Sequence, residues 1–114
     1  MKSKNFKSYF KKRIDTDMAE FRRIMLTSKD KNEIEITDKL FLIDCKKSLQ
    51  FLQKNIESVY FDMFYDKYIL EKTMDNIAYK YKCDVSTEIR NISKAICKIA
   101  VFRYTETYIL SFLL

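Results

Sequence analysis

The chain has 114 residues, the size of one domain and too short for two hydrophobic cores. It contains no Gly and no Pro, so it lacks the residues that tight hairpins and glycine-rich phosphate loops require. It has no His, which excludes a Ser-His-Asp site, a Cys-His site and a zinc site that uses histidine. Because 47% of the residues are hydrophobic, the chain can bury a core. The absence of Gly and Pro predicts that this core belongs to one small all-α domain whose helices are joined by short polar links.

The net charge is +6, from 22 basic and 16 acidic residues. Such a charge indicates either a polyanionic partner, with nucleic acid first, or a soluble surface rich in lysine. Residues 1–31 hold ten basic and four acidic residues, residues 32–70 have a balance of −2, and residues 71–114 have a balance of +2. The surplus therefore lies at both ends of the chain.

The three cysteines, Cys45, Cys83 and Cys97, have no CxxC spacing, which is typical of reduced and mostly buried thiols. The basic start lacks the apolar stretch of a secretory signal, and the apolar run at the end is too short to span a bilayer. We expect a cytoplasmic protein with no cofactor, no metal site and no membrane association.

The first predicted element is a basic N-terminal helix within residues 1–31. Its apolar residues follow one another at steps of four, four, four, three and four: Phe6, Phe10, Ile14, Met18, Phe21 and Met25. Most basic residues lie off this stripe, and we expect Lys11, Lys12 and Arg13 to touch phosphates. The polar residues 28–32 then predict a linker.

Residues 37–70 are predicted to form the middle helices, with Thr37 or Asp38 as the N-cap. Two groups of apolar residues are predicted to form the core faces. The first group is Phe41, Leu42, Ile43, Cys45, Leu49 and Leu52, and the second is Val59, Tyr60, Met63, Phe64 and Tyr68. Asn55 lies between the groups, so the segment is either one bent helix or two helices.

Residues 73–100 carry the pattern of a helix-turn-helix. Thr73 is placed to cap a first short helix, whose inward residues are Met74, Ile77, Ala78 and Tyr81. The pattern breaks at residues 82–83, and Asp84 is placed to cap a second short helix. Isoleucines and a valine at steps of four, three, four and three predict the buried side of that helix: Val85, Ile89, Ile92, Ile96 and Ile99.

The opposite side of the second helix suits the major groove of DNA. It carries one polar stripe, formed by Thr87, Arg90, Asn91, Lys94 and Lys98. Arg can pair with guanine, Asn with adenine, and Lys neutralises phosphates. We add Lys80 and Lys82, beside the turn, to this predicted DNA-binding set. The competing interpretation is an ordinary solvated helix face.

Two segments resemble known regulators. Tyr68-Ile69 followed by Thr73-Met74-Asp75-Asn76-Ile77-Ala78-Tyr79-Lys80-Tyr81 resembles the opening of sigma-factor region four, and Lys94-Ala95-Ile96-Cys97-Lys98-Ile99-Ala100 is similar to the close of ArpU/RinA-type phage late-gene regulators. The match covers about a quarter to a third of the chain. This resemblance implies a protein that binds double-stranded DNA at phage late-gene promoters and regulates transcription there.

The chain departs from the family pattern at two places. Lys82 stands in the turn where the family has a small residue or Asn, at a position that favours positive φ. Glu88 stands at the first apolar position of the recognition helix, whereas the apolar residue here is Ile89. This departure predicts a DNA-facing stripe shifted by one residue from the family register.

Two other classes of function compete with DNA binding. Asp62 and Asp66 lie one helical turn apart, but helix surfaces carry such pairs routinely, so we do not expect an enzyme. The alternative is a small helical protein-protein interaction module, supported by the apolar C-terminal tail at residues 101–114. That tail could pack on the core, form a homodimer seam or dock on a partner such as RNA polymerase.

Overall fold

The computed structural model describes the backbone of residues 2–27 and 34–113, and the side chains of residues 8–27 and 34–105. These residues form five helices and no strand: α1 (Lys2–Thr27), α2 (Ile36–Asn55), α3 (Ser58–Tyr68), α4 (Met74–Tyr81) and α5 (Val85–Leu113). The prediction of an all-α fold is confirmed. In this part of the chain no helix is both long and apolar enough to cross a membrane.

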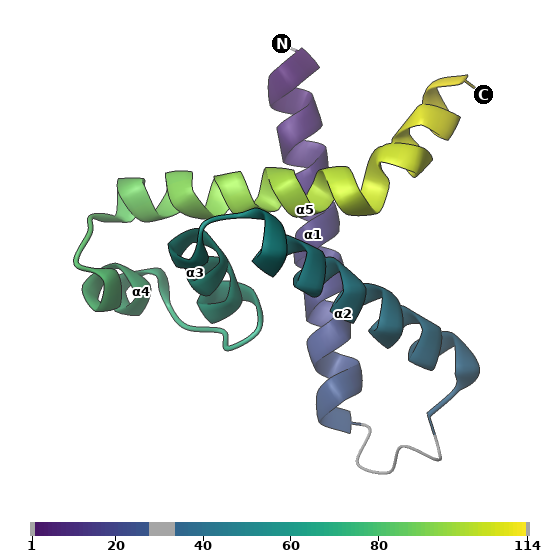
Figure 1. The fold of residues 1–114 in the computed structure, drawn as a ribbon, viewed down its shortest axis with the longest axis horizontal. Helices are drawn as coiled ribbons and strands as arrows, with labels where there is room; N and C mark the ends of the chain where they lie inside the picture. Colours follow the sequence, from purple (N-terminus) through teal and green to yellow (C-terminus); the bar gives the residue numbers. More distant parts are fainter. Residues whose placement is uncertain (1, 28–33, 114) are drawn as a thin grey trace.

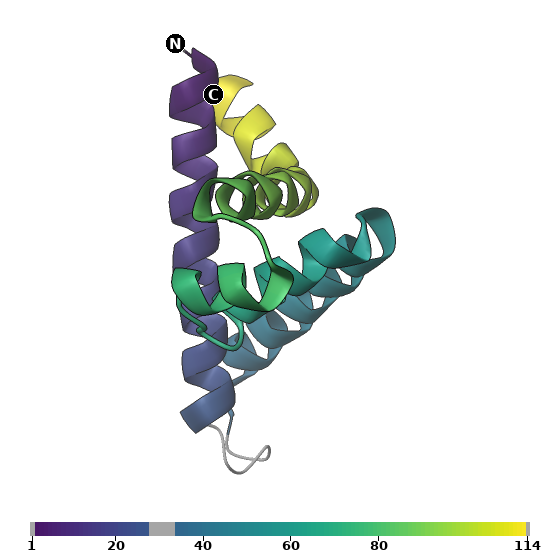
Figure 2. The same ribbon diagram turned by 90° about the vertical axis from the view of Figure 1, so that its left-hand side faces the viewer.

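The long helix α5 organises the fold, because it packs against each of the other four helices. It crosses α1, which forms a separate layer behind α5 and α2 (Figures 1 and 2). Each helix contributes buried apolar side chains to one core, among them Ile14, Leu52, Phe64, Ile77 and Ile99, none of which is exposed to solvent. This burial explains why the chain folds without Gly or Pro, since helical packing needs neither.

The apolar stripe of the first helix is confirmed at four positions and wrong at one. Phe10, Ile14, Met18 and Phe21 are buried, but Ile24 occupies the next core position, while Met25 is 49% exposed. Helical spacing alone would keep Met25 in line with Ile14 and Met18. The buried face of α1 instead turns toward Ile24 in the last turns of the helix, and Met25 lines an open groove there. The side chain of Phe6 and the predicted linker at residues 28–32 lie outside the described residues.

The middle segment is two helices, since α2 ends at Asn55 and α3 begins at Ser58. Ile56 between them is extended, with φ −143° and ψ 160°, which interrupts the helical hydrogen bonding. The predicted N-cap of α2 is wrong: the helix begins at Ile36, and Glu35 takes the cap position without a side-chain hydrogen bond. Ile43 is also 51% exposed rather than part of the core face.

A buried arginine that the sequence analysis did not single out joins three helices. The Arg103 side chain of α5 is 6% exposed and forms ion pairs with Asp17 of α1 at 3.0 Å and Asp44 of α2 at 2.9 Å. It also donates to Ser48 Oγ at 2.7 Å, and Tyr104 donates its hydroxyl hydrogen to Asp17. These polar contacts determine how α1, α2 and α5 meet.

The three thiols are free and differ in exposure. Burial raises the pKa of the Cys45 thiol to about 11, so it stays protonated and acts as a small core residue. Cys83 is half-buried in the turn before α5, and Cys97 is exposed on α5. The prediction of mostly buried thiols is therefore wrong for Cys97.

Candidate nucleic-acid interface

Helix α4 begins as the sequence predicts. The Thr73 side chain accepts a hydrogen bond from the Asn76 backbone N–H at 3.1 Å, which caps the helix. Ile77 and Ala78 are buried toward the core, while Tyr79 points outward and is 88% exposed. The inner face of this short helix is therefore fixed, and its outer face is open to a partner.

A buried carboxylate on α3 holds α4 in place. Asp66 accepts hydrogen bonds from Lys80 Nζ and the Tyr81 hydroxyl, each at 2.8 Å, and pairs with Lys72 at 3.4 Å. Burial opposes ionisation of Asp66, but the hydrogen bonds from Lys80 and Tyr81 outweigh it and lower the pKa of its carboxyl. Lys80, one of the predicted DNA-binding residues, is therefore already paired within the protein.

The turn between α4 and α5 is three residues long, at positions 82–84. Lys82 takes the left-handed conformation, with φ 54° and ψ 46°, and its N–H donates to the carbonyls of Ala78 and Tyr79. A non-glycine residue pays about 1 kcal/mol for this conformation, because its Cβ crowds the following carbonyl. The positive φ that we expected at this turn position is present, and the Lys82 side chain is exposed.

Asp84 caps the start of α5, as predicted. One of its carboxylate oxygens accepts from the Thr87 backbone N–H at 2.7 Å and from the Ser86 hydroxyl at 2.9 Å. The hydrogen bond from the Thr87 backbone is the main reason that the pKa of the Asp84 carboxyl is lowered. The short turn and this cap together fix which side of α5 faces α4.

The buried side that the isoleucine spacing predicts is confirmed at Ile92, Ile96 and Ile99 and is wrong at Val85 and Ile89. Glu88 is fully buried, whereas Ile89 is 50% exposed and Val85 is 38% exposed. The predicted shift by one residue is therefore wrong, because Glu88 itself occupies the buried position. At about 100° per residue, the outward face at the start of α5 is rotated by roughly 60° from the predicted stripe.

The structure separates the predicted stripe into free and engaged residues. Arg90 is exposed and donates to Thr87 Oγ1 at 3.1 Å, and Lys98 is exposed without a partner among the described residues. Lys94 lies over the Tyr60 ring at 4.8 Å from its centroid. Asn91 is half-buried, and its amide contacts Met63 Sδ at 3.7 Å, so it lies against α3 rather than outward.

The outward row that replaces the predicted stripe consists of exposed residues at the start of α5. They are Ser86, Ile89, Arg90 and Ser93, with Lys94 and Lys98 following along the helix. Ser86 and Ser93 are not among the residues predicted to bind DNA, and Ile89 was predicted to be buried. The resemblance to the regulators could have indicated these residues. It aligns Glu88 with an apolar, inward position, and positions 89, 90 and 93 then face outward.

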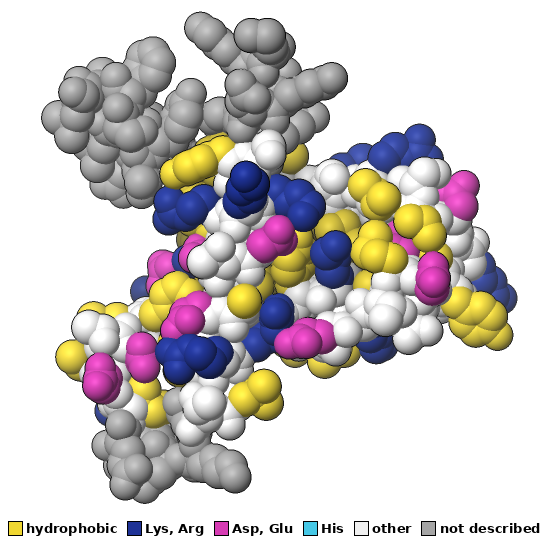
Figure 3. Space-filling model, turned by 180° about the vertical axis from the view of Figure 1, so that it is seen from behind, with side chains coloured by type: hydrophobic (Ala, Val, Ile, Leu, Met, Phe, Trp, Pro, Cys, Tyr) yellow, Lys and Arg dark blue, Asp and Glu magenta, His cyan; other side chains and the backbone are white. Residues whose placement is uncertain are grey.

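The basic residues of α1 lie at another part of the molecule. Arg13 stacks over the Tyr104 ring, with its guanidinium carbon 4.8 Å from the ring centroid. Tyr104 lies 14 residues beyond Arg90 on α5, which is about 21 Å along the helix, so the basic residues of α1 lie far from Arg90. Lys11 pairs with Asp15 at 3.1 Å, and Lys12 has no partner among the described residues. Seen from behind, the described side chains of this face are a mixture of basic and acidic residues (Figure 3).

Comparison with known proteins finds no matching family model, no similar curated protein and no similar solved structure. The case for a function therefore rests on the residues and their geometry.

Proposed function

We propose that this protein binds double-stranded DNA in a sequence-specific manner, with α4 and α5 acting as a helix-turn-helix. The observation that carries the proposal is the row Ser86, Ile89, Arg90 and Ser93, exposed at the start of a capped helix after a three-residue turn. Recognition helices place such N-terminal residues against base edges in the major groove. The resemblance to phage late-gene regulators extends the proposal to transcriptional control at such promoters.

The side chains of this row match the chemistry of the major groove. Arg90 reads guanine through its two-pronged guanidinium, and Ile89 packs on a thymine methyl. Ser86 and Ser93 donate to base or phosphate oxygens. Three exposed lysines, at positions 82, 94 and 98, neutralise phosphates and supply the part of the affinity that depends on salt.

The test begins with selection of bound sequences from a random duplex pool. Arg90→Ala should weaken binding to the selected site by about 1–3 kcal/mol and relax the base preference at one position. Asn91→Ala is the matched control, because Asn91 lies against α3 and should not change base preference. If no sequence is enriched, or if Arg90→Ala binds the selected site as the parent does, the proposal is wrong.

A protein-interaction module is the second candidate, and the apolar members of the same face favour it. Ile89, Val101 and Phe102 are each about half exposed, and Phe102 stacks on Phe51 of α2 with ring centroids 4.3 Å apart. An open groove of about 760 Å³ runs along this face of α5. Retention on duplex DNA separates the candidates, because a DNA-binding protein shows a steep salt dependence and an adaptor does not.

A further inference from the structure

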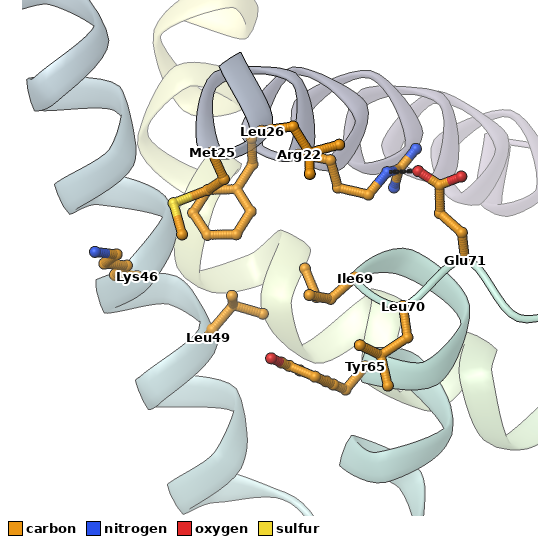
Figure 4. A pocket seen from close by; sticks show the side chains of 10 residues that line it. Arg22, Met25, Leu26, Lys46, Leu49, Tyr65, Ile69, Leu70 and Glu71 are labelled. Carbon is orange, nitrogen blue, oxygen red and sulfur yellow. Dashed lines mark ion pairs between the residues drawn. The ribbon is translucent and has the colours of Figure 1, made fainter. Parts of the chain in front are cut away.

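A second groove lies away from the proposed DNA-binding face. It is formed where the last turns of α1, the middle of α2 and the end of α3 meet, and it has a volume of about 610 Å³. Its walls are mostly apolar, and Figure 4 shows them converging from the three helices: Met25, Leu26, Leu49, Tyr65, Ile69 and Leu70. A groove of this size and composition is typical of a site that holds apolar side chains.

The groove leaves large apolar side chains in contact with water. Leu26 is 74% exposed, Leu70 52% and Met25 49%. Single exposed apolar residues are common, but a contiguous group around a depression marks an interaction site.

Charges sit at two ends of this groove. At one end Arg22 forms an ion pair with Glu71, so that end is neutral (Figure 4). At the other end Lys46 is exposed and has no partner among the described residues. The groove therefore favours an apolar occupant that brings one negative charge.

The C-terminal tail has that composition. After Tyr104 the sequence reads Thr-Glu-Thr-Tyr-Ile-Leu-Ser-Phe-Leu-Leu, which is apolar except for polar Thr and Ser and one charge at Glu106. Its backbone continues α5 as a helix to Leu113. An apolar helix that docks in a groove is a recurring mode of recognition.

The tail cannot reach the groove of its own chain. Tyr104 stacks on Phe10 of α1 with ring centroids 5.7 Å apart, whereas the groove begins at Phe21, about 16 Å further along that helix. Beyond Tyr104 the helix rises on the side of the N-terminal end of α1, away from the last turns of α1, which line the groove (Figures 1 and 2).

We propose that the protein forms a two-fold homodimer in which the C-terminal tail of each copy fills the groove of the other, with Glu106 meeting Lys46 of the partner copy. A reciprocal exchange of this kind closes after two chains. It would bury Leu26 and Leu70, which the single chain exposes in the groove. The proposal does not depend on DNA binding, and its test is made without DNA.

The test measures solution mass across a range of protein concentrations. The parent chain should have the mass of two chains. The double substitution Leu26→Gln and Leu70→Gln should raise the dimer dissociation constant at least tenfold, because two apolar side chains of the groove become polar. Leu40→Gln is the matched control, since Leu40 is 60% exposed on α2 and lies outside the groove, and it should leave the mass unchanged.

Charge reversal tests the register of the tail in the groove. Lys46→Glu and Glu106→Lys should each weaken the dimer about two- to fivefold, and combining the two should restore it. Circular dichroism and melting verify that each variant is folded. A parent chain that stays monomeric, a Leu26/Leu70 variant that dimerises like the parent, or a double charge reversal without rescue each overturns the proposal.

Discussion

The buried Glu88 should lower the stability of this protein, and replacing it should raise the free energy of unfolding. Glu88 lies in the first turn of α5, is fully buried, and neither of its carboxylate oxygens has a hydrogen-bond partner. Burial raises the pKa of its carboxyl and the charge of Asp75 adds to this shift, whereas the charge of Lys67 and an interaction with the Ala78 backbone oppose it. The interaction with Ala78 does not meet the geometry of a hydrogen bond, so it leaves the carboxylate unsatisfied. The perturbation we choose is Glu88→Leu, which keeps the volume and removes the polar group.

The expected gain is about 2 kcal/mol at pH 7. An unsatisfied buried polar group costs about 1–3 kcal/mol, and apolar replacement of buried charged groups stabilises proteins by about 1–4 kcal/mol. The attraction of Lys67 reduces the cost of the charge, so we take the middle of these ranges. For a domain of this size, about 2 kcal/mol corresponds to a rise in melting temperature of about 8 °C.

The dependence on pH identifies the carboxylate as the cause. In the unfolded chain Glu88 titrates near 4.5, and in the folded protein its pKa is higher. The parent should therefore lose stability as the pH rises from about 4.5 through the folded pKa, relative to Glu88→Gln, which cannot titrate. Urea unfolding between pH 4 and pH 8 measures this difference, and Asp62→Asn, at an exposed position on α3, is the control.

Parallel stability curves would refute this reasoning. If the parent, Glu88→Gln and Glu88→Leu differ by a constant amount at every pH, then the Glu88 carboxylate is not buried without partners. A Glu88→Leu variant less stable than the parent would mean that Glu88 makes a stabilising contact in solution.

Three further predictions test the packing and the basic segment. Ile92→Ala should lower the free energy of unfolding by about 2–5 kcal/mol, since Ile92 is 3% exposed, while Ile89→Ala should change it by less than about 0.5 kcal/mol; denaturant titration compares them. Arg103→Met should cost about 3 kcal/mol in the same assay, because it removes the positive charge beside Asp17 and leaves that carboxylate only the Tyr104 hydroxyl among the described residues. Lys11→Gln with Lys12→Gln should weaken binding to all duplexes alike and reduce the salt slope by about 0.9 for each phosphate that is no longer neutralised; an unchanged slope would mean that these lysines touch no phosphate.

Most of the helical core could be predicted from apolar spacing. In α1 the buried residues Phe10, Ile14, Met18 and Phe21 follow one stripe, because this part of the helix packs with one face, and among the described side chains the prediction fails only at Met25 in the last turns. The caps at Thr73 and Asp84 were equally predictable, since each depends on a local hydrogen bond within one turn.

The orientation of α5 could not be predicted from its spacing, because the helix meets different neighbours along its length. Near its start the buried positions are Glu88, Ile92 and Ala95, and later they include Ala100 and Tyr104. The buried face therefore turns around the helix axis along α5. A prediction that assumes one straight stripe of isoleucines cannot describe this turn. The residue type argues against burial of Glu88, since burying a charge without a partner is costly. Only the resemblance to the regulators, which have an apolar residue at this position, indicated that position 88 lies inside.

The position of Arg103 has a consequence for folding during synthesis. Its ion pair with Asp17 joins residues 86 positions apart, and Tyr104 covers Phe10 at an even greater separation. At about 5–20 residues per second, a ribosome needs roughly 4–17 s to travel from the first partner to the second. During that interval the apolar stripe of α1 cannot pack against α5, because α5 has not been synthesised. The nascent chain therefore exposes an apolar helix face that is buried in the finished protein and that chaperones or other nascent chains can bind.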